Sequence, residues 1–505
     1  MIKKNNSKKR FVIPLLIVGG IISGISYQTM QFYLAWFSLI PLFYLFQKAN
    51  ARQSFFYGLL YGIVTSSILF YWVFPVATRY SGVFTFYSIL FYGAAVIYFS
   101  LYFALFGIGY KFLHDHSKST ILSGISVSAF YVLIELTRIS LLPGLPWFHY
   151  NLAVTQAQNL WIIQWASIGG FYIIIFTIVL FNYLLTQFLI RKENILLKTA
   201  LAAIIIFFWG GFLLSKINDE VKGDKINAVI LNENISAETR WNDLTGDSLS
   251  NVFFKLNEDA VRYNPDLIIW SESAIPWKFE PDDEFIPKVL SITHRSKADH
   301  LLGILSPSSQ NSQLVYNSAY LIKNDGRIAD KYDKTILLDF LEKPFSGGLL
   351  SVLPFINTSR YDNILPGKSQ NVIKSGKAQI GVLICNESLS EDIYARYIKA
   401  KANLLILMSN DAWFENTLLQ MHHFYITRIE AVMVGRDVII NSNRGLIGII
   451  RSNGNVESLP QSDTARILNC EAHLSSKTTI YSEIRNFSIP LYLLLTFFSI
   501  IKRMK

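Results

Sequence analysis

Two residues with reactive side chains, Glu272 and Cys385, each stand just past an apolar segment that is typical of a buried strand. Ligands gather at strand ends in α/β folds, so such residues are candidates for a site. A carboxylate in an apolar setting can have a raised pKa and serve as general base, and a cysteine can act as nucleophile. Between them, Lys334 opens another apolar segment, where a fixed ammonium could stabilise an oxyanion. We expect Cys385 to be the nucleophile.

Each of these residues also has an ordinary structural interpretation. Glu272 could be a solvated turn residue, Lys334 a surface lysine, and Cys385 a buried structural cysteine. The chain has one other cysteine, Cys470, which we expect to pack in a core. A disulfide between the two cysteines stays open, because spacing alone does not establish one.

Residues 216–485 have the composition of a soluble domain in which β-rich runs alternate with helical patterns. Several runs are almost entirely apolar, as strands buried on both faces are. The expected strands are Ile226–Leu231, Leu267–Trp270, His300–Leu305, Ser318–Ile322, Ala378–Ile384, Ala402–Met408, Val438–Asn441 and Gly445–Ile450. The expected helices are Ser248–Tyr263, Ile286–Lys297, Glu391–Ala400 and Asn416–Val434. The pattern predicts an α/β or α+β sandwich covered by helices.

The remainder of the chain is apolar enough for a bilayer. Overall 51% of the residues are hydrophobic and 16% are charged, whereas soluble globular proteins have about 25% charged residues. A spanning helix needs about 20 apolar residues. The eight candidate spans are 11–28, 31–47, 54–76, 84–112, 119–137, 159–190, 197–215 and 486–501, of which the second and the eighth are the weakest by length. We therefore expect a membrane domain over 1–215 with about seven helices, a catalytic domain over 216–485, and a C-terminal helix with a basic tail over 486–505.

Basic residues indicate the orientation. With the N-terminus in the cytoplasm, the short outside loops hold only Arg79 and Arg138. The inside loops hold Lys48, Arg52, Lys111, Lys118, Arg191, Lys192 and Lys198, besides two basic termini. This bias toward the inside predicts that the catalytic domain lies outside the cytoplasm. The net charge of +10 comes largely from clusters beside apolar runs, so we expect no nucleic-acid partner.

The sequence shows no metal or cofactor signature. His422 and His423 are adjacent, so they point in different directions and lack partners at ligand spacing. The run 346–348 lacks the strand–turn–helix context of a phosphate-binding loop. We therefore expect neither a metal nor a cofactor.

The three reactive segments, in their order along the chain, resemble those of the apolipoprotein N-acyltransferases, the membrane-embedded branch of the nitrilase or carbon–nitrogen hydrolase superfamily. The resemblance covers nearly the whole chain, including the expected spans. The motifs that carry it are Trp-Ser-Glu-Ser-Ala-Ile-Pro (270–276), Tyr-Asn-Ser-Ala (316–319), Tyr-Asp-Lys (332–334), Pro-Gly (366–367), Ile-Cys-Asn-Glu (384–387), Ser-Asn-Asp-Ala-Trp-Phe (409–414) and His-Phe (423–424). Each motif is short, and their order and spacing make them specific.

The resemblance implies an α-helical membrane bundle of about eight spans joined to a nitrilase-like αββα sandwich. It also implies a catalytic triad in which Glu272 is the general base, Lys334 stabilises the oxyanion and Cys385 is the nucleophile. Glu342 and Glu387 match further functional acids that would support the triad. The residues implied to bind substrate are Trp241, Asn410, Trp413 and His423.

The implied reaction has two steps. Cys385 takes an acyl chain from a phospholipid as a thioester, and the N-terminal amine of an S-diacylglyceryl-cysteine on an apolipoprotein then takes it as an amide. The resemblance places the enzyme in the bacterial cytoplasmic (inner) membrane as a multi-pass protein, and we expect a monomer. The segment Phe340–Phe355, apolar and broken by Gly and Pro, is expected to be a mobile flap that touches lipid.

The chain departs from the usual family pattern at Leu341, Asn386, Glu430 and Arg444. A second interpretation is therefore a membrane-bound amidase or acyltransferase of the same superfamily with a different acyl acceptor. A third is a transporter or scaffold whose nitrilase-like domain only binds. Ionisable residues within spans would favour transport, and the candidates here are Glu135 and Arg138 near one span's end, so the sequence disfavours the third interpretation.

Overall fold

The computed structural model divides into two compact units. The helical unit comprises Met1–Leu142, Phe148–Ile217 and Glu483–Lys505, and the α/β unit comprises Pro143–Trp147 and Asn218–Ser482. The structure describes residues 11–81, 85–117, 119–142, 144–145, 150–218, 223–239, 242, 245–280, 284–311, 313–344, 363–368 and 371–504. Each unit is described by itself below.

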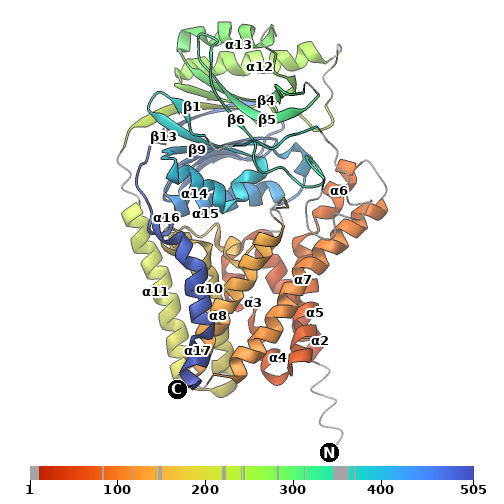
Figure 1. The fold of residues 1–505 in the computed structure, drawn as a ribbon, viewed down its shortest axis with the longest axis vertical. Coiled ribbons are helices and arrows are strands. Elements are labelled where there is room, and N and C mark those ends of the chain that lie inside the picture. The colour runs from red at the N-terminus through yellow and green to blue at the C-terminus, as the bar shows by residue number, and fades with distance from the viewer. Residues whose placement is uncertain are drawn as a thin grey trace, which may run out of the picture. The chain divides into compact units, whose positions relative to one another are not determined.

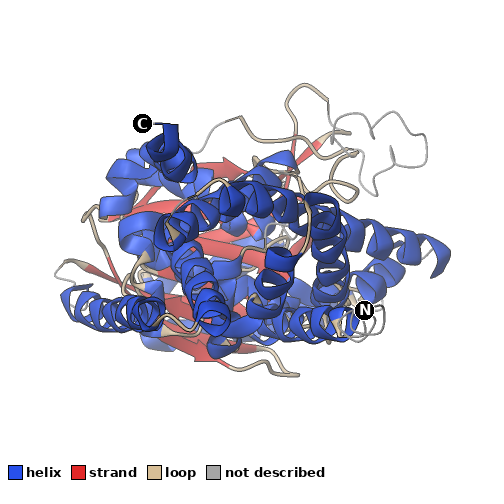
Figure 2. Cartoon of the chain, turned by 90° about the horizontal axis from the view of Figure 1, so that it is seen from below, coloured by secondary structure: helices blue, strands red, loops and turns tan. Residues whose placement is uncertain are grey.

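Long apolar helices form the helical unit (Figure 1). They are α2 (Val12–Thr29), α3 (Phe32–Ser38), α4 (Ile40–Lys48), α5 (Ala51–Leu69), α6 (Val73–Ser81), α7 (Thr85–Asp115), α8 (Thr120–Leu141), α9 (Leu160–Ile163), α10 (Ala166–Arg191), α11 (Asn194–Asn218) and α17 (Ser488–Met504), with the short η2 (Leu152–Gln156). Helix α5 packs against α2 and α7, and α8 packs against α7, α10 and α17. The view from below shows these helices side by side as a bundle (Figure 2).

The expected count of eight spans is not confirmed. Among the described residues, five helices are long and apolar enough to cross a membrane, or six if α5 and α6, bent by 50°, form one span. The second expected span is two short helices, α3 and α4, and α17 has 17 residues. The break between α3 and α4 is stabilised by Asn182, which accepts from the Leu39 N–H (3.1 Å) and donates to the Ala35 carbonyl (3.0 Å). Exposed backbone groups in an apolar environment need such partners.

Two sheets form the centre of the α/β unit. The first has the order β13-β1-β2-β4-β5-β6, with β3 paired to β4, and the second has the order β12-β11-β10-β9-β8-β7. Their strands are β1 (Lys225–Asn232), β2 (Leu267–Ile269), β3 (Ile275–Lys278), β4 (Asp299–Pro307), β5 (Val315–Ile322), β6 (Ile328–Asp333), β7 (Ile373–Ser375), β8 (Ala378–Ile384), β9 (Leu404–Asn410), β10 (Val438–Asn443), β11 (Ile447–Ile450), β12 (Val456–Leu459) and β13 (Arg466–His473). The β1–β2–β4 and β8–β9–β10 pairings are parallel, so several strands of each sheet end at one edge.

Helices cover the outer face of each sheet, which confirms the predicted αββα sandwich (Figure 1). Helices α12 (Gly246–Ala260) and α13 (Phe285–Thr293) cover the first sheet, and α14 (Glu391–Lys399) and α15 (Leu419–Val434) cover the second. Beneath α12 and α13, the Trp270 ring stacks on Phe253 with centroids 5.0 Å apart, and its Nε1 donates to His300 Nδ1 at 3.2 Å. Burial of these rings fixes the chain just after β2, where Glu272 follows.

Candidate active site

Glu272 lies in the turn that follows β2 and is buried. Ser273 beside it has a positive φ of 46°, an uncommon conformation for a side-chain-bearing residue. The Glu272 carboxylate accepts two hydrogen bonds, at Oε1 from Asn317 Nδ2 (2.8 Å) and at Oε2 from the Asn410 N–H (3.0 Å). Residues from β5 and from the end of β9 therefore orient it.

Lys334 directly follows β6, and its backbone N–H donates to the Asn317 carbonyl at 2.8 Å. This bond extends the antiparallel β5–β6 ladder by one residue. On its other side, the Gly367 N–H donates to the Lys334 carbonyl at 2.7 Å. A side chain at Gly367 would meet the Asp333 carbonyl oxygen at 2.1 Å, so the close approach requires glycine.

Two carboxylates share the Lys334 ammonium. Lys334 Nζ lies 2.9 Å from Glu342 Oε2 and 3.5 Å from Glu272 Oε1. Asn317 Nδ2, which binds Glu272, also donates to Glu342 Oε1 at 3.2 Å. Glu342 is held in turn by the Leu338 N–H, 2.8 Å from its Oε2. Lys334 and Asn317 thus bridge the same two acids.

Cys385 follows β8 and begins the short helix η6 (Cys385–Leu389). Its φ of 52° makes a sharp bend at the strand end. The Cys385 carbonyl accepts hydrogen bonds from Ser388 Oγ (3.0 Å) and from His423 Nε2 (3.1 Å), and His423 Nδ1 lies 3.1 Å from Asp411 Oδ1. Because that acid holds the ring on its other nitrogen, the His423 imidazole fixes the backbone of the bend.

Glu387 ties the bend at Cys385 to the loop after Lys334. Its Oε2 accepts from the Ile384 N–H at 3.0 Å. Its Oε1 accepts from the N–H groups of Thr335 (2.7 Å) and Ile336 (3.1 Å), from the Thr335 hydroxyl (2.8 Å) and from the Tyr332 hydroxyl (2.8 Å). The carboxylate is fully buried and surrounded by these donors. Its observed contacts are with backbone N–H and hydroxyl groups of the segments that carry the reactive residues.

Burial and charge shift the proton equilibria of the site. Burial raises the pKa of Glu272, which the Lys334 ammonium partly offsets. Burial alone would lower the pKa of Lys334, but Glu342 and Glu272 outweigh it and raise that pKa, so the ammonium stays charged. The pKa of Cys385 is raised well above its usual value, first by burial and then by Glu272, while Lys334 lowers it. The resting thiol is therefore protonated, and a carboxylate with a raised pKa lies in the same electrostatic environment.

The expected substrate-binding residues have different surroundings. His423 is buried and its ring contacts protein groups, as described above. Asn410 is half-buried, and its Oδ1 accepts from Asn443 Nδ2 at 3.0 Å. Trp413 is half-buried in η7 (Asp411–Phe414). Trp241 and positions 345–355 of the expected flap lie outside the described residues. Substrate contact by these residues stays a prediction.

Sequence reasoning did not assign a role to Asn317, Asp411 or Ser388. Asn317 occurs in the Tyr-Asn-Ser-Ala motif of a largely buried strand, and a polar residue at such a position was the available signal. Ser388 Oγ lies 2.7 Å from His423 Nε2. The roles of Asp411 and Ser388 depend on contacts across the second sheet that local pattern does not reveal.

The other chemical candidates are separate from this cluster. Both cysteines are free, so no disulfide joins Cys385 to Cys470, and Cys470 is buried in β13. Within the described part of the chain, no group of three or more His, Cys, Asp or Glu residues could hold a metal ion.

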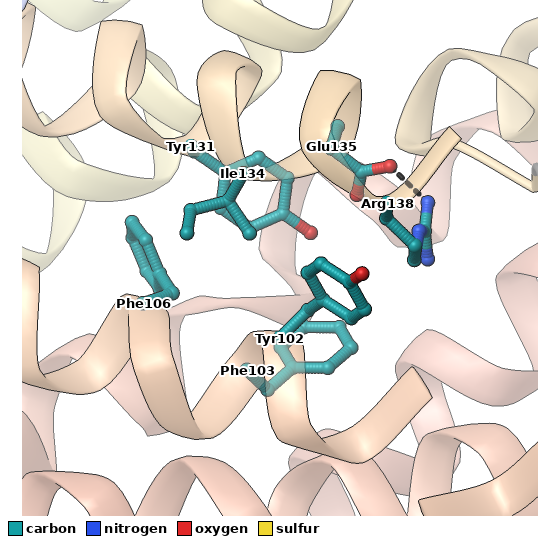
Figure 3. Close-up of a pocket in the computed structure, with 7 residues that line it drawn as sticks. All are labelled: Tyr102, Phe103, Phe106, Tyr131, Ile134, Glu135 and Arg138. Atoms are coloured by element: carbon teal, nitrogen blue, oxygen red, sulfur yellow. Dashed lines mark hydrogen bonds and ion pairs between the residues drawn. The ribbon is translucent and has the colours of Figure 1, made fainter. Parts of the chain in front are cut away.

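A small pocket lies between α7 and α8 in the helical unit (Figure 3). Glu135 and Arg138 of α8 form a buried ion pair at its edge, and the guanidinium also donates to the Tyr150 carbonyl. The Arg138 guanidinium carbon lies 4.0 Å from the centroid of the Phe99 ring. The other lining residues are Tyr102, Phe103, Phe106, Tyr131 and Ile134. The two opposite charges neutralise each other, which is typical of a structural pair.

Comparison with known proteins gives two family matches along the chain. Residues 19–184 match the apolipoprotein N-acyltransferase N-terminal domain, and residues 225–484 match carbon–nitrogen hydrolase. The chain is 25% identical over 483 residues to an apolipoprotein N-acyltransferase of Geobacter metallireducens, covering 93% of this chain and 90% of that protein. Proteins of the same name from Shewanella oneidensis (24% identical, 87% and 85% covered) and Rickettsia prowazekii (25% identical, 96% and 96% covered) are also similar.

Proposed function

The chain belongs to the apolipoprotein N-acyltransferase branch of the carbon–nitrogen hydrolase family, and from this membership we propose that it transfers an acyl chain from a phospholipid to the N-terminal amine of a diacylglyceryl apolipoprotein. The similarity to proteins of that name extends over nearly their whole length, and the family matches cover both units. The observation that carries the proposal is the buried ammonium of Lys334 between two carboxylates, in the electrostatic environment of the Cys385 thiol.

In the first step, Glu272 takes the proton of the Cys385 thiol as the sulfur attacks the ester carbonyl of the phospholipid. The tetrahedral oxyanion that forms is stabilised by the Lys334 ammonium, which the raised pKa keeps charged. When the C–O ester bond breaks, the proton on Glu272 passes to the leaving alkoxide, and a lysophospholipid departs. The acyl chain remains on Cys385 as a thioester.

In the second step, the neutral amine of the acceptor attacks the thioester carbonyl. Glu272 accepts the proton that the amine loses, and Lys334 again stabilises the oxyanion. The C–S bond breaks, the amide leaves, and the proton returns from Glu272 to sulfur. The raised pKa of Glu272 suits both directions of proton transfer, because a general base works best when its pKa is near the operating pH.

Glu342 and Glu387 support this chemistry without contacting the reacting carbonyl. Glu342 orients the ammonium of Lys334, and Glu387 holds the Thr335–Ile336 peptides against the bend at Cys385. As part of the proposal, we assign substrate binding to Trp241, Asn410, Trp413 and His423. His423 acts on the substrate indirectly, because it binds the Cys385 carbonyl.

The chain is a multi-pass protein of the bacterial inner membrane. We propose that the catalytic domain, over residues 216–485, lies on the extracytoplasmic side between a membrane domain (1–215) and a closing helix (486–505). The asymmetry of Lys and Arg between alternate loops supports this orientation. The partners in this proposal are the phospholipid donor and the apolipoprotein acceptor, and the enzyme acts as a monomer without a nucleic-acid partner.

Transfer to a defined acceptor tests the proposal. Purified protein in phospholipid micelles is given a synthetic lipopeptide with a free N-terminal diacylglyceryl-cysteine, and mass spectrometry follows the lipopeptide. We expect the lipopeptide to gain one acyl chain with the wild-type chain and none with Cys385→Ser. If phospholipid is consumed but only another amine is acylated, the enzyme has a different acceptor. If no acyl group moves to any amine, the proposed function is wrong.

A further inference from the structure

The Asn386 side chain joins the bend at the nucleophile to the loop that follows Lys334. Asn386 is fully buried, and its Nδ2 donates to the Ile336 carbonyl at 3.1 Å. Its Oδ1 is also buried and has no hydrogen-bond partner among the described residues. Burying an amide whose oxygen has no hydrogen-bond partner costs free energy. We therefore expect the hydrogen bond that Asn386 Nδ2 donates to be useful to the folded protein.

The adjacent Glu387 binds the backbone of the same residue, Ile336, through its other polar group. Its Oε1 accepts from the Ile336 N–H, while Asn386 Nδ2 donates to the Ile336 C=O. Two consecutive residues after Cys385 thus bind both polar groups of one residue in the loop after Lys334. The loop cannot slide past the bend without breaking both bonds.

Ile336 lies in the chain between the backbone anchor of Lys334 and the residue that holds Glu342, the acid bound to the Lys334 ammonium. Two residues before it, Lys334 is anchored by its backbone to β5. Two residues after it, the Leu338 N–H binds Glu342 Oε2, and Glu342 binds the ammonium. Movement of the Ile336 peptide would therefore move both the lysine and the acid that orients it.

We propose that Asn386 is a positioning residue that holds the Lys334 loop, and with it the Lys334 ammonium, against the Cys385 thiol. This assignment rests on the proposed function only for its effect on acyl transfer. The effect on the thiol itself follows from geometry and can be measured without any lipid.

The pKa of the Cys385 thiol depends on how close the Lys334 ammonium lies, because most of the charges around the thiol are negative. The charged groups that act on Cys385 are Glu272, Lys334, Asp411 and Glu342, and the titratable side chains that bind the backbone of the bend are Glu387 and His423. Among the first four, Lys334 is the one that favours the thiolate. If the ammonium moves away, the thiol loses the charge that favours the thiolate and ionises at higher pH.

The test measures the rate of Cys385 alkylation by iodoacetamide as a function of pH, in a Cys470→Ser background so that one thiol reacts. Asn386→Ala should slow alkylation at neutral pH about tenfold, the equivalent of about one pKa unit, and move the midpoint of the profile to higher pH. Asn386→Leu keeps a similar volume, lacks the donor and adds no charge, so it should show at least the same shift and keeps the test valid if Asn386→Ala does not fold. The rate of acyl-enzyme formation should fall by a similar factor in kcat with little change in KM.

Asn257 provides a matched control in α12. It is fully buried, its Nδ2 donates to the Phe253 carbonyl at 2.8 Å, and its Oδ1 has no partner among the described residues. Asn257→Ala should leave the alkylation profile unchanged. An unchanged profile in Asn386→Leu, or an equal shift in Asn257→Ala, overturns the positioning role. If the Asn386 variants shift the profile but no variant or wild-type chain transfers an acyl group, the positioning role stands and the proposed function fails.

Discussion

The helical unit and the α/β unit each bury a basic side chain against acid, but the charge balance differs. In the helical unit, Arg138 meets one carboxylate, Glu135, and its guanidinium also binds the Tyr150 carbonyl. In the α/β unit, Lys334 meets two carboxylates, Glu272 and Glu342. The first cluster is neutral as a pair. The second carries an excess of negative charge and lies beside a protonated thiol.

This difference separates a structural ion pair from a reactive one. The balanced pair holds helix α8 to the segment before η2, because Arg138 also donates to the Tyr150 carbonyl. An unbalanced cluster keeps one carboxyl with a raised pKa and can therefore take up and release a proton. Changes to the first cluster should alter stability, and changes to the second should alter activity.

The largest effect is expected from Arg138→Met. It leaves the Glu135 carboxylate buried without its partner, which costs about 3–5 kcal/mol. Thermal unfolding in detergent should show this loss, while the folded fraction should keep the wild-type rate of acyl-enzyme formation. A folded Arg138→Met protein with a strongly reduced acylation rate would show that this cluster also takes part in the reaction.

Lys334→Met should have the next largest effect, this time on activity. Loss of one oxyanion donor lowers rates by about 10²–10³-fold, or roughly 2.7–4 kcal/mol. Single-turnover acylation by phospholipid measures the change. The matched control is Lys331→Met, because Lys331 pairs with Asp333 at 3.1 Å but is partly exposed. Equal loss in both variants would contradict the special role of the shared ammonium.

Asn317→Ala should lower the acylation rate about tenfold near neutral pH and change its pH dependence. The Asn317 amide lowers the pKa of Glu272, so its removal raises that pKa further. Glu272 acts as base only when ionised, so activity falls as pH falls through its pKa, and the acidic limb should move to higher pH. Activity should recover as the pH rises. A uniform loss at all pH values would instead indicate a purely structural role.

The smallest effect is expected from the double change Glu135→Leu with Arg138→Met. Replacing a balanced buried pair by apolar residues of similar volume is often close to neutral, so the loss should be about 1 kcal/mol or less. Thermal unfolding should place the double variant near the wild type and well above Arg138→Met. A double variant as unstable as the single one would show that Arg138 acts through Tyr150 or Phe99 rather than through its charge balance.

Most of the α/β fold was predictable from pattern. All eight expected strands and four expected helices are present, since buried strands are almost entirely apolar and helices have a distinct period. The strands β3, β6, β7, β12 and β13 were not expected, because they are short or carry mixed polar residues. The missed β6 matters most, since it places Lys334 at a strand end like Glu272 and Cys385.

The sequence proposed the reactive residues of the site but not the contacts that support them. Their positions after apolar runs and the family motifs pointed to Glu272, Lys334 and Cys385. The hydrogen bonds from Asn317 to two acids and from Asn386 to Ile336 join segments that are distant in the sequence. Local sequence patterns do not predict such contacts. The span count of eight is not confirmed, because short apolar runs such as α3 and α4 have the composition of a span without its length.

Acylation of the protein by phospholipid without an acceptor shows directly which residue is the nucleophile. The Cys470→Ser protein is incubated with phospholipid alone, digested, and mapped by mass spectrometry. We expect one acyl group on the peptide that contains Cys385, removable by hydroxylamine as a thioester is, and no acyl group in the Cys385→Ser protein. An acyl group on another residue, or none on Cys385 while transfer to the lipopeptide still proceeds, would contradict Cys385 as the nucleophile.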